Sequence, residues 1–136
     1  MGSIMACRFE FDAMNRILLL RFDGRLTEEL FKELYWAVRR YSTATDASAG
    51  IWDLSNVTEF AVSPEFIRDL VNWGPAMPNA TTRPRFFVAP AMVGLSTSRL
   101  FEIAASDRNP LFKVVRSLNE ALATLGVQSP HFEPLQ

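Results

Sequence analysis

Strand-like and helical segments alternate along most of this chain, and this alternation constrains the fold more than any other feature. Residues 7–11 and 16–22 are strand-like and are separated by turn residues, so they predict an antiparallel hairpin that ends at Asp23-Gly24. Later strand-like segments lie at residues 50–54, 85–89 and 111–115. The predicted order β-β-α-β-α-β-α-β-α favours an α/β domain with a mixed sheet, largely parallel with an antiparallel first strand.

The first predicted helix has clear signals at both ends. Thr27 is expected to be its N-cap, with Glu28 and Glu29 in the first turn and Arg39-Arg40 in the last, followed by a loop over residues 42–48. Apolar residues at helical spacing form its buried stripe, namely Leu30, Leu34, Ala37, Val38 and Tyr41. Aromatic residues widen this stripe beyond one core face, which favours a homodimer.

Three more helices are expected, two between the later strands and one after the last strand. Residues 63–65, Ser-Pro-Glu, are a typical helix start, with an N-cap, a proline at the first helical position and an acid in the first turn. A third helix is expected around residues 98–105. The capping box of residues 117–120 opens the fourth helix, which Gly126 ends.

The length of 136 residues fits one domain, because two halves would each be too small to bury a core. The pattern covers residues 7–126, and residues 127–136 are expected to be a loose C-terminal tail. Hydrophobic residues make up 49% and charged residues 21%, as in ordinary globular proteins. The formal net charge of −1 provides no general attraction to nucleic acid or to an anionic membrane, so neither is an expected partner.

We expect a cytoplasmic protein without membrane insertion. Cys7 is the only cysteine, which rules out an internal disulfide and is typical of a reducing compartment. Residues 1–6 lack the charged and apolar regions of a signal peptide. The apolar segment 86–95 is about half as long as a bilayer span requires.

Three segments have the residues and spacing of a known domain. Residues 51–57, Ile-Trp-Asp-Leu-Ser-Asn-Val, match a strand and turn of the form hydrophobic-Asp-Leu-Ser-x-Val, and Ser63 follows ten residues after Asp53. Residues 112–122 match a final strand and helix. The order and spacing resemble the STAS domain of bacterial anti-sigma factor antagonists and of the cytoplasmic tails of sulphate transporters. The resemblance implies a STAS-like fold over about residues 7 to 126.

The hairpin from Asp12 to Gly24 is similar to that of uncharacterised STAS-like proteins. These proteins are described as related to the sporulation anti-anti-sigma factor or to Sec14-type lipid-binding domains. The resemblance therefore implies a regulatory protein-interaction module without enzymatic activity. The alternative that it implies is a small-molecule or lipid-binding domain with an apolar pocket.

Ser63 has two interpretations. As a structural residue it is an N-cap whose hydroxyl accepts a backbone N–H. The family resemblance instead implies a phosphoacceptor or a partner contact at this position. In the phosphorylated antagonists an acid and a glycine surround the serine, whereas Ala61 and Pro64 stand there in this chain. This departure argues against phosphorylation by a partner kinase and leaves both interpretations open.

The resemblance also implies a protein-binding face near Ser63, formed by an expected loop around Asn56 to Ser63 and the exposed side of the helix that follows. The implied partner is an anti-sigma or kinase-like regulator. Its expected residues are Asp53, Ser55, Asn56, Arg68 and Asp69. Asp53 ends a buried strand at the carboxyl edge of the sheet, where open α/β sheets bind ligands. Its structural alternative is to accept N–H groups from Ser55 or Asn56.

Eleven phenylalanines and three tryptophans are many for a chain of this length. They favour a packed core, and the alternative is an apolar pocket whose expected lining includes Phe60, Trp73 and Phe101.

Catalytic motifs are not found in the sequence. The only histidine, His131, lies in the predicted tail, so a catalytic serine or cysteine has no histidine partner in the expected domain. The sequence also has no cluster of cysteine, histidine and carboxylate residues at the spacing of metal ligands. The glycines are scattered and form no phosphate-binding loop. We expect no enzymatic activity, no metal and no cofactor.

Overall fold

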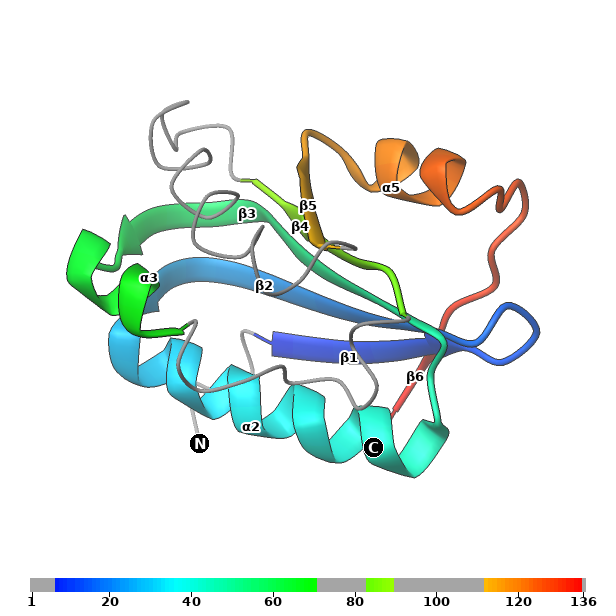
Figure 1. The fold of residues 1–136 in the computed structure, drawn as a ribbon, viewed down its shortest axis with the longest axis horizontal. Helices are drawn as coiled ribbons and strands as arrows, with labels where there is room; N and C mark the ends of the chain where they lie inside the picture. The colour runs from blue at the N-terminus through cyan, green and yellow to red at the C-terminus, as the bar shows by residue number, and fades with distance from the viewer. Residues whose placement is uncertain (1–6, 71–82, 90–111, 136) are drawn as a thin grey trace.

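A computed structural model describes residues 7–70, 83–89 and 112–135 of the chain. They form an α/β fold around a mixed sheet of six strands in the order β5-β4-β3-β2-β1-β6. Figure 1 shows α2 (Glu28–Thr45) along one face of the sheet and α5 (Leu118–Thr124) on the other side. The predicted α/β class with a mixed sheet is confirmed. The helix expected around residues 98–105 lies outside the described residues.

The N-terminal hairpin forms as predicted. β1 (Cys7–Asp12) and β2 (Ile17–Thr27) are antiparallel, and every residue of β1 has a partner in β2. The Asp12 carboxylate stabilises the turn, because it accepts the N–H of Asn15 at 3.1 Å and its side-chain amide at 2.7 Å.

β2 does not end at Asp23-Gly24, as the sequence predicted, but continues to Thr27. Gly24 has a φ of 104°, which a residue with a side chain rarely adopts, and the register with β3 shifts on both sides of this glycine. The Asp-Gly pair therefore causes an irregularity inside a long strand and not a turn. The strand continues because β3 (Ala49–Ala61) offers it a parallel partner beyond this point.

Thr27 caps α2 as predicted, with its hydroxyl accepting the N–H of Leu30 at 3.2 Å. The helix continues to Thr45, so the prediction that Arg39-Arg40 ends it was wrong. Residues 42–45 were expected in a loop but are helical. They are helical because Ser42 faces the sheet and is fully buried there, which extends the packed side of the helix by a turn.

β3 is also longer than predicted. A loop was expected from Asn56 to Ser63, but residues 56–61 pair with the continued part of β2. The short helix α3 (Pro64–Leu70) follows directly. The two errors have one physical cause, because each strand extension supplies the hydrogen-bond partners of the other.

The second half of the sheet is parallel, as expected. β4 (Arg85–Val88) lies between β3 and β5 (Phe112–Val115) and is parallel to both. Residues 50–53 of β3 lie opposite residues 85–88, so these segments are sheet neighbours.

α5 begins at the predicted capping box. The Ser117 hydroxyl accepts the N–H of Glu120 at 3.1 Å, and the Glu120 carboxylate accepts the N–H of Arg116 at 3.2 Å. Gly126, with a φ of 74°, follows the helix as expected.

The C-terminal segment is not the loose tail that the sequence predicted. β6 (Glu133–Pro134) pairs antiparallel with β1, and the N–H of Leu135 donates to the carbonyl of Phe9 at 2.8 Å. The N–H of His131 donates to the buried Asp12 carboxylate at 3.2 Å. These bonds place the segment along the edge of β1, which would otherwise present unpaired backbone groups.

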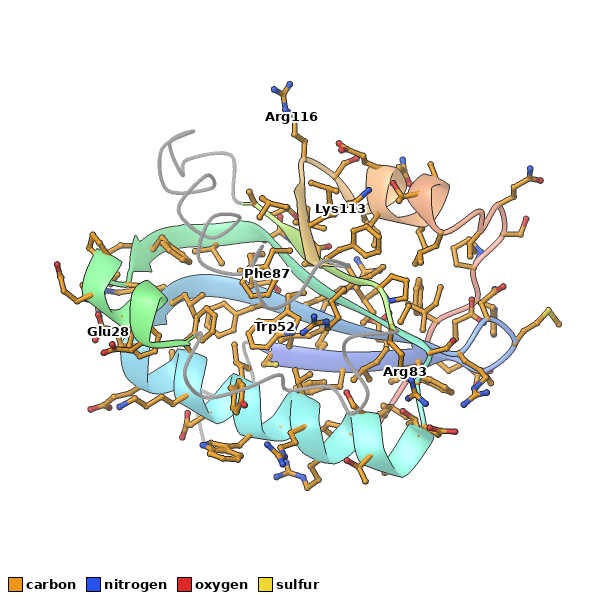
Figure 2. All side chains as sticks on the ribbon, viewed as in Figure 1. Glu28, Trp52, Arg83, Phe87, Lys113 and Arg116 are labelled. Atoms are coloured by element: carbon orange, nitrogen blue, oxygen red, sulfur yellow. The ribbon has the colours of Figure 1, made fainter. Side chains whose placement is uncertain are left out.

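Each face of the sheet has its own core, because alternate side chains of a strand point to opposite faces. The core under α2 is rich in aromatic residues and includes Phe22, Phe31, Tyr35, Trp52 and Phe66. The core under α5 is mainly aliphatic and includes Ile17, Leu19, Ile51, Val88, Val115 and Leu122. Figure 2 labels Trp52 and Phe87 in the first core, where their ring centroids are 5.1 Å apart.

Candidate functional site

Ser63 connects the starts of two helices. Its hydroxyl accepts the N–H of Phe66 at 3.1 Å, so the predicted capping role is confirmed. Its own N–H donates to the carboxylate of Glu28, the first residue of α2, at 2.8 Å. Figure 2 labels Glu28 at this end of α2, close to α3. The Glu28–Ser63 contact therefore links α3 to α2 across 35 residues of sequence.

The electrostatics of this contact favour an ionised Glu28. Hydrogen bonds from the backbone and then the side chain of Ser63 hold the pKa of the Glu28 carboxyl below its ordinary value, and the charge of Lys32 adds to this. Glu65 and Asp69 are exposed on α3 and add two acidic side chains to this region. A negative group added to Ser63 would lie beside the Glu28 carboxylate. The two negative groups would repel each other, whereas the Ser63 N–H and the carboxylate now attract each other.

Asp53 is 8% exposed and has a structural role. Its carboxylate accepts the N–H of Ser55 at 3.1 Å and the Ser55 hydroxyl at 2.6 Å, which was one of the two predicted roles. The Arg21 guanidinium lies between two carboxylates, with Nη1 3.9 Å from Asp53 Oδ2 and Nε 3.4 Å from Glu10 Oε2. Glu10, Arg21 and Asp53 thus form a charged row across β1, β2 and β3, on the sheet face opposite α2.

The structure divides the predicted binding face into two parts. Ser55 and Asn56 are exposed in the middle of β3. Asn56 is five strand residues before Ala61, a distance of about 16 Å. Asp69 is exposed on α3, the helix that Ser63 caps, and Arg68 belongs to the same helix. Ser63 and Asp69 therefore share one element, whereas Asp53, Ser55 and Asn56 belong to another region.

Of the three residues predicted to line an apolar pocket, Phe60 alone is within the described part of the chain. Phe60 is half-buried and packs against the core under α2. Trp73 and Phe101 lie outside the described residues. An open depression on the described surface follows the first turns of α2 and is lined by Thr27, Glu29, Leu30, Lys32 and Glu33.

An ionic cluster that the sequence did not predict lies at the other end of α2. Arg16 donates to the Asp46 carboxylate at 2.7 Å, and Arg83 lies 3.1 Å from the same group. Arg83 also donates to the carbonyl of Ala47 at 2.8 Å. The hydrogen bond and charge of Arg83, and then the charge of Arg16, hold the pKa of Asp46 below its ordinary value. Figure 2 labels Arg83 here, away from Glu28.

A second unpredicted contact involves Asp12, which is 1% exposed. Burial opposes ionisation of this carboxyl, but hydrogen bonds from Asn15 and His131 outweigh it, so its pKa lies below the ordinary value. Asp12 was recognised as a turn residue from its neighbours. The bond to His131 had no local signal, because the two residues are 119 positions apart.

Within the described residues, no group of three His, Cys, Asp or Glu side chains could hold a metal ion. No helix in the same ranges is long and apolar enough to cross a membrane. Comparison with known proteins finds no protein-family model and no curated protein that matches this sequence. The geometry around Ser63 and the sequence motifs are therefore the features that indicate a function.

Proposed function

We propose that this chain is a non-enzymatic, cytoplasmic regulatory module of the STAS type. It binds a protein partner at the start of α3, and negative charge at Ser63 releases that partner. The observation that carries the proposal is the 2.8 Å hydrogen bond from the Ser63 N–H to the Glu28 carboxylate. The resemblance of residues 51–57 and 112–122 to the STAS domain supports the same function.

The Glu28–Ser63 contact provides the physical basis of release. A phosphate on Ser63 would add up to about two negative charges beside Glu28. The resulting repulsion would break the link between α2 and α3, because the N–H of Ser63 could no longer approach the carboxylate. α3 would then change its position relative to α2, and the surface that the partner recognises would be altered.

The exposed side of α3 indicates the kind of partner. Glu65 and Asp69 are exposed there, so a complementary partner would present basic side chains. An anti-sigma or kinase-like regulator with a basic contact surface fits this proposal.

The test begins with protein purified from its native host under several growth conditions. Mass spectrometry should find phosphate on Ser63 in at least one condition. The protein partner that copurifies with the wild type should remain bound to Ser63→Ala and should be lost from Ser63→Asp. We expect at least a tenfold loss of affinity, which corresponds to about 1.4 kcal/mol.

Ser117→Asp is the matched control, because Ser117 caps α5 in the same way but has no contact with Glu28. It should leave the partner bound. Combining Ser63→Asp with Glu28→Gln should restore binding, because the repelling carboxylate is removed. A Ser63 that carries no phosphate in any condition, together with an unchanged Ser63→Asp complex, would overturn the proposal. An apolar ligand found by native mass spectrometry, with no protein partner, would replace it with the ligand-binding alternative.

A further inference from the structure

We propose that the chain forms a symmetric dimer through the exposed side of α2. The two copies of the helix lie antiparallel, with Trp36 at the centre of the interface. This inference goes beyond the proposed function and does not depend on it, because it uses neither Ser63 nor α3. It rests on three features of α2: the exposed side chain of Trp36, the charged residues on either side of it, and the depression that Glu29 and Glu33 line.

Trp36 is 58% exposed, although it lies on the helix that covers the aromatic core. α2 spans Glu28–Thr45, so Trp36 lies at the middle of the helix. Its ring packs edge-on against Tyr35 at 5.1 Å, and the Arg39 guanidinium lies 5.8 Å from its centroid. Tryptophan and arginine are typical of interface centres, and side chains already held in place lose less entropy on binding.

The exposed charges of α2 have opposite sign on the two sides of Trp36. Glu29 and Glu33 are exposed before it, whereas Arg39 and Arg40 are exposed after it. Among the described residues, neither arginine has an acidic partner within salt-bridge distance. The helix surface therefore has an acidic half and a basic half that meet at the tryptophan.

A two-fold axis at the middle of the helix makes this surface complementary to itself. Glu33 and Arg40 are equally far from the midpoint of α2, so in an antiparallel pair Glu33 lies level with Arg40 of the second copy. A parallel pair would place Glu33 against Glu33 and Arg40 against Arg40. The charges thus select the antiparallel arrangement.

The depression on α2 lies in the acidic half, where Glu29 and Glu33 contribute to its lining. In the antiparallel pair the arginines of the second copy reach this half, and their long side chains can enter the depression. Lys32 is the basic exception there, and its charge acts on Glu28 of its own helix. An anionic membrane fits this face less well, because the exposed carboxylates would repel it.

The size of the contact sets the expected affinity. One helix pair buries an area at the low end of specific interfaces, so the dimer should be weak and depend on concentration. We expect a Kd in the range of about 1–100 µM at low salt, rising with ionic strength because the charges are exposed.

Sedimentation velocity of the full chain, from about 1 µM to about 1 mM, tests the proposal. The wild type should change from monomer to dimer over this range. Trp36→Ala should raise the dimer Kd at least about tenfold. The double variants Glu29→Lys with Glu33→Lys, and Arg39→Glu with Arg40→Glu, should each be monomeric, because each gives both halves of the exposed helix surface the same predominant sign. Circular dichroism confirms that each variant is folded.

Mixing the two double variants provides the decisive measurement. The basic helix surface of one variant should pair with the mainly acidic helix surface of the other, and the equimolar mixture should form a heterodimer. The matched control reverses two exposed charges beyond α2, Lys113→Glu with Arg116→Glu, which Figure 2 shows on the α5 side of the sheet. It should dimerise like the wild type.

Several results would overturn the proposal. One is a wild type that stays monomeric throughout the range, and another is a dimer that the Trp36 and charge variants leave unchanged. A mixture of the double variants that stays monomeric would have the same effect. A monomeric wild type that binds a poly-glutamate peptide would replace the second copy with an acidic partner, and binding to phosphatidylserine vesicles would replace it with a membrane.

Discussion

The face of the sheet under α2 is filled with aromatic rings, whereas the opposite face combines a mainly aliphatic core with charged side chains. Phe31 of α2 is buried and lies 5.1 Å from Trp52 and 6.2 Å from Phe87, measured between ring centroids. On the opposite face, Arg21 lies between the carboxylates of Glu10 and Asp53. The strands β1, β2 and β3 contribute side chains to both faces.

This difference shows how one strand can carry two kinds of stabilisation. Trp52 and Asp53 are neighbours in β3, yet the first joins the aromatic core and the second joins the charged row. A substitution in a packed core lowers the free energy of unfolding in proportion to the atoms removed and the cavity left behind. In a charged row, removing a single member lowers the free energy of unfolding most, because the remaining charges stay partly buried without a partner.

The largest effect should come from Phe31→Ala. The side chain is 1% exposed and contacts several rings that cannot all move into the space it leaves. We expect the free energy of unfolding in urea to fall by about 3–5 kcal/mol.

A matched pair of leucines checks whether the two faces differ. Leu34→Ala on α2 and Leu122→Ala on α5 remove the same atoms from sites that are 5% and 6% exposed. The α2 variant should lose more stability, because its side chain packs in the core that contains the large aromatic rings. Equal losses would mean that the two faces are packed equally well.

An intermediate effect is expected from Arg21→Met, which keeps much of the side-chain volume but removes the charge. Glu10 and Asp53 would then share one face without a cation, and stability at pH 7 should fall by about 1–2 kcal/mol. This is less than for a fully buried pair, because the Arg21 side chain is 31% exposed.

Arg25→Met is the control for this change. Arg25 lies on the same strand and pairs with Glu59 at 3.1 Å, but both side chains are 59% exposed. Arg25→Met should change the free energy of unfolding by less than about 0.5 kcal/mol. If the two arginine variants were equally stable in urea, the charged row would have no stabilising role.

The smallest effect is expected from Glu28→Gln, and it should depend on pH. The folded-state pKa of Glu28 is lowered, so its contact with Ser63 stabilises the protein above the unfolded pKa of about 4.3. That contribution is lost as pH falls through the lower folded pKa. The variant should therefore melt below the wild type at pH 7, and the difference in Tm should close in acid.

Glu29→Gln serves as the comparison for the pH series, at protein concentrations too low for dimer formation. Both acids lie in the first turn of α2, but Glu28 is the one bonded to Ser63. A Tm difference for Glu28→Gln that stayed constant from pH 7 to strong acid would show that the ionised contact does not stabilise the fold.

Local patterns predicted the parts of the fold whose causes are local. The hairpin, the caps at Thr27, Ser63 and Ser117, and the stop at Gly126 all involve hydrogen bonds or turns between residues a few positions apart. The same kind of pattern was misleading at Asp23-Gly24, because a turn signal there was overridden by a strand partner.

The candidate site was predicted in part. Ser63 and its capping role followed from the residues around it, and so did the bond between Asp53 and Ser55. The contact with Glu28 did not, because nothing near residue 63 indicates which carboxylate will approach it. Ser55 and Asn56 were expected to share one binding face with Ser63, because residues 56–63 were predicted to form a loop. Residues 56–61 are in fact part of a strand.

By itself the sequence determined where strands and helices begin, which side of each is apolar, and which residues cap the helices, since neighbouring residues decide these features. Tertiary structure alone decided how far β2, β3 and α2 extend, where the C-terminal segment lies, and which charges meet. Backbone groups of a strand, and charged side chains such as Glu28 and Arg21, meet partners that are distant in sequence. Such partners are brought together only when the whole chain is folded.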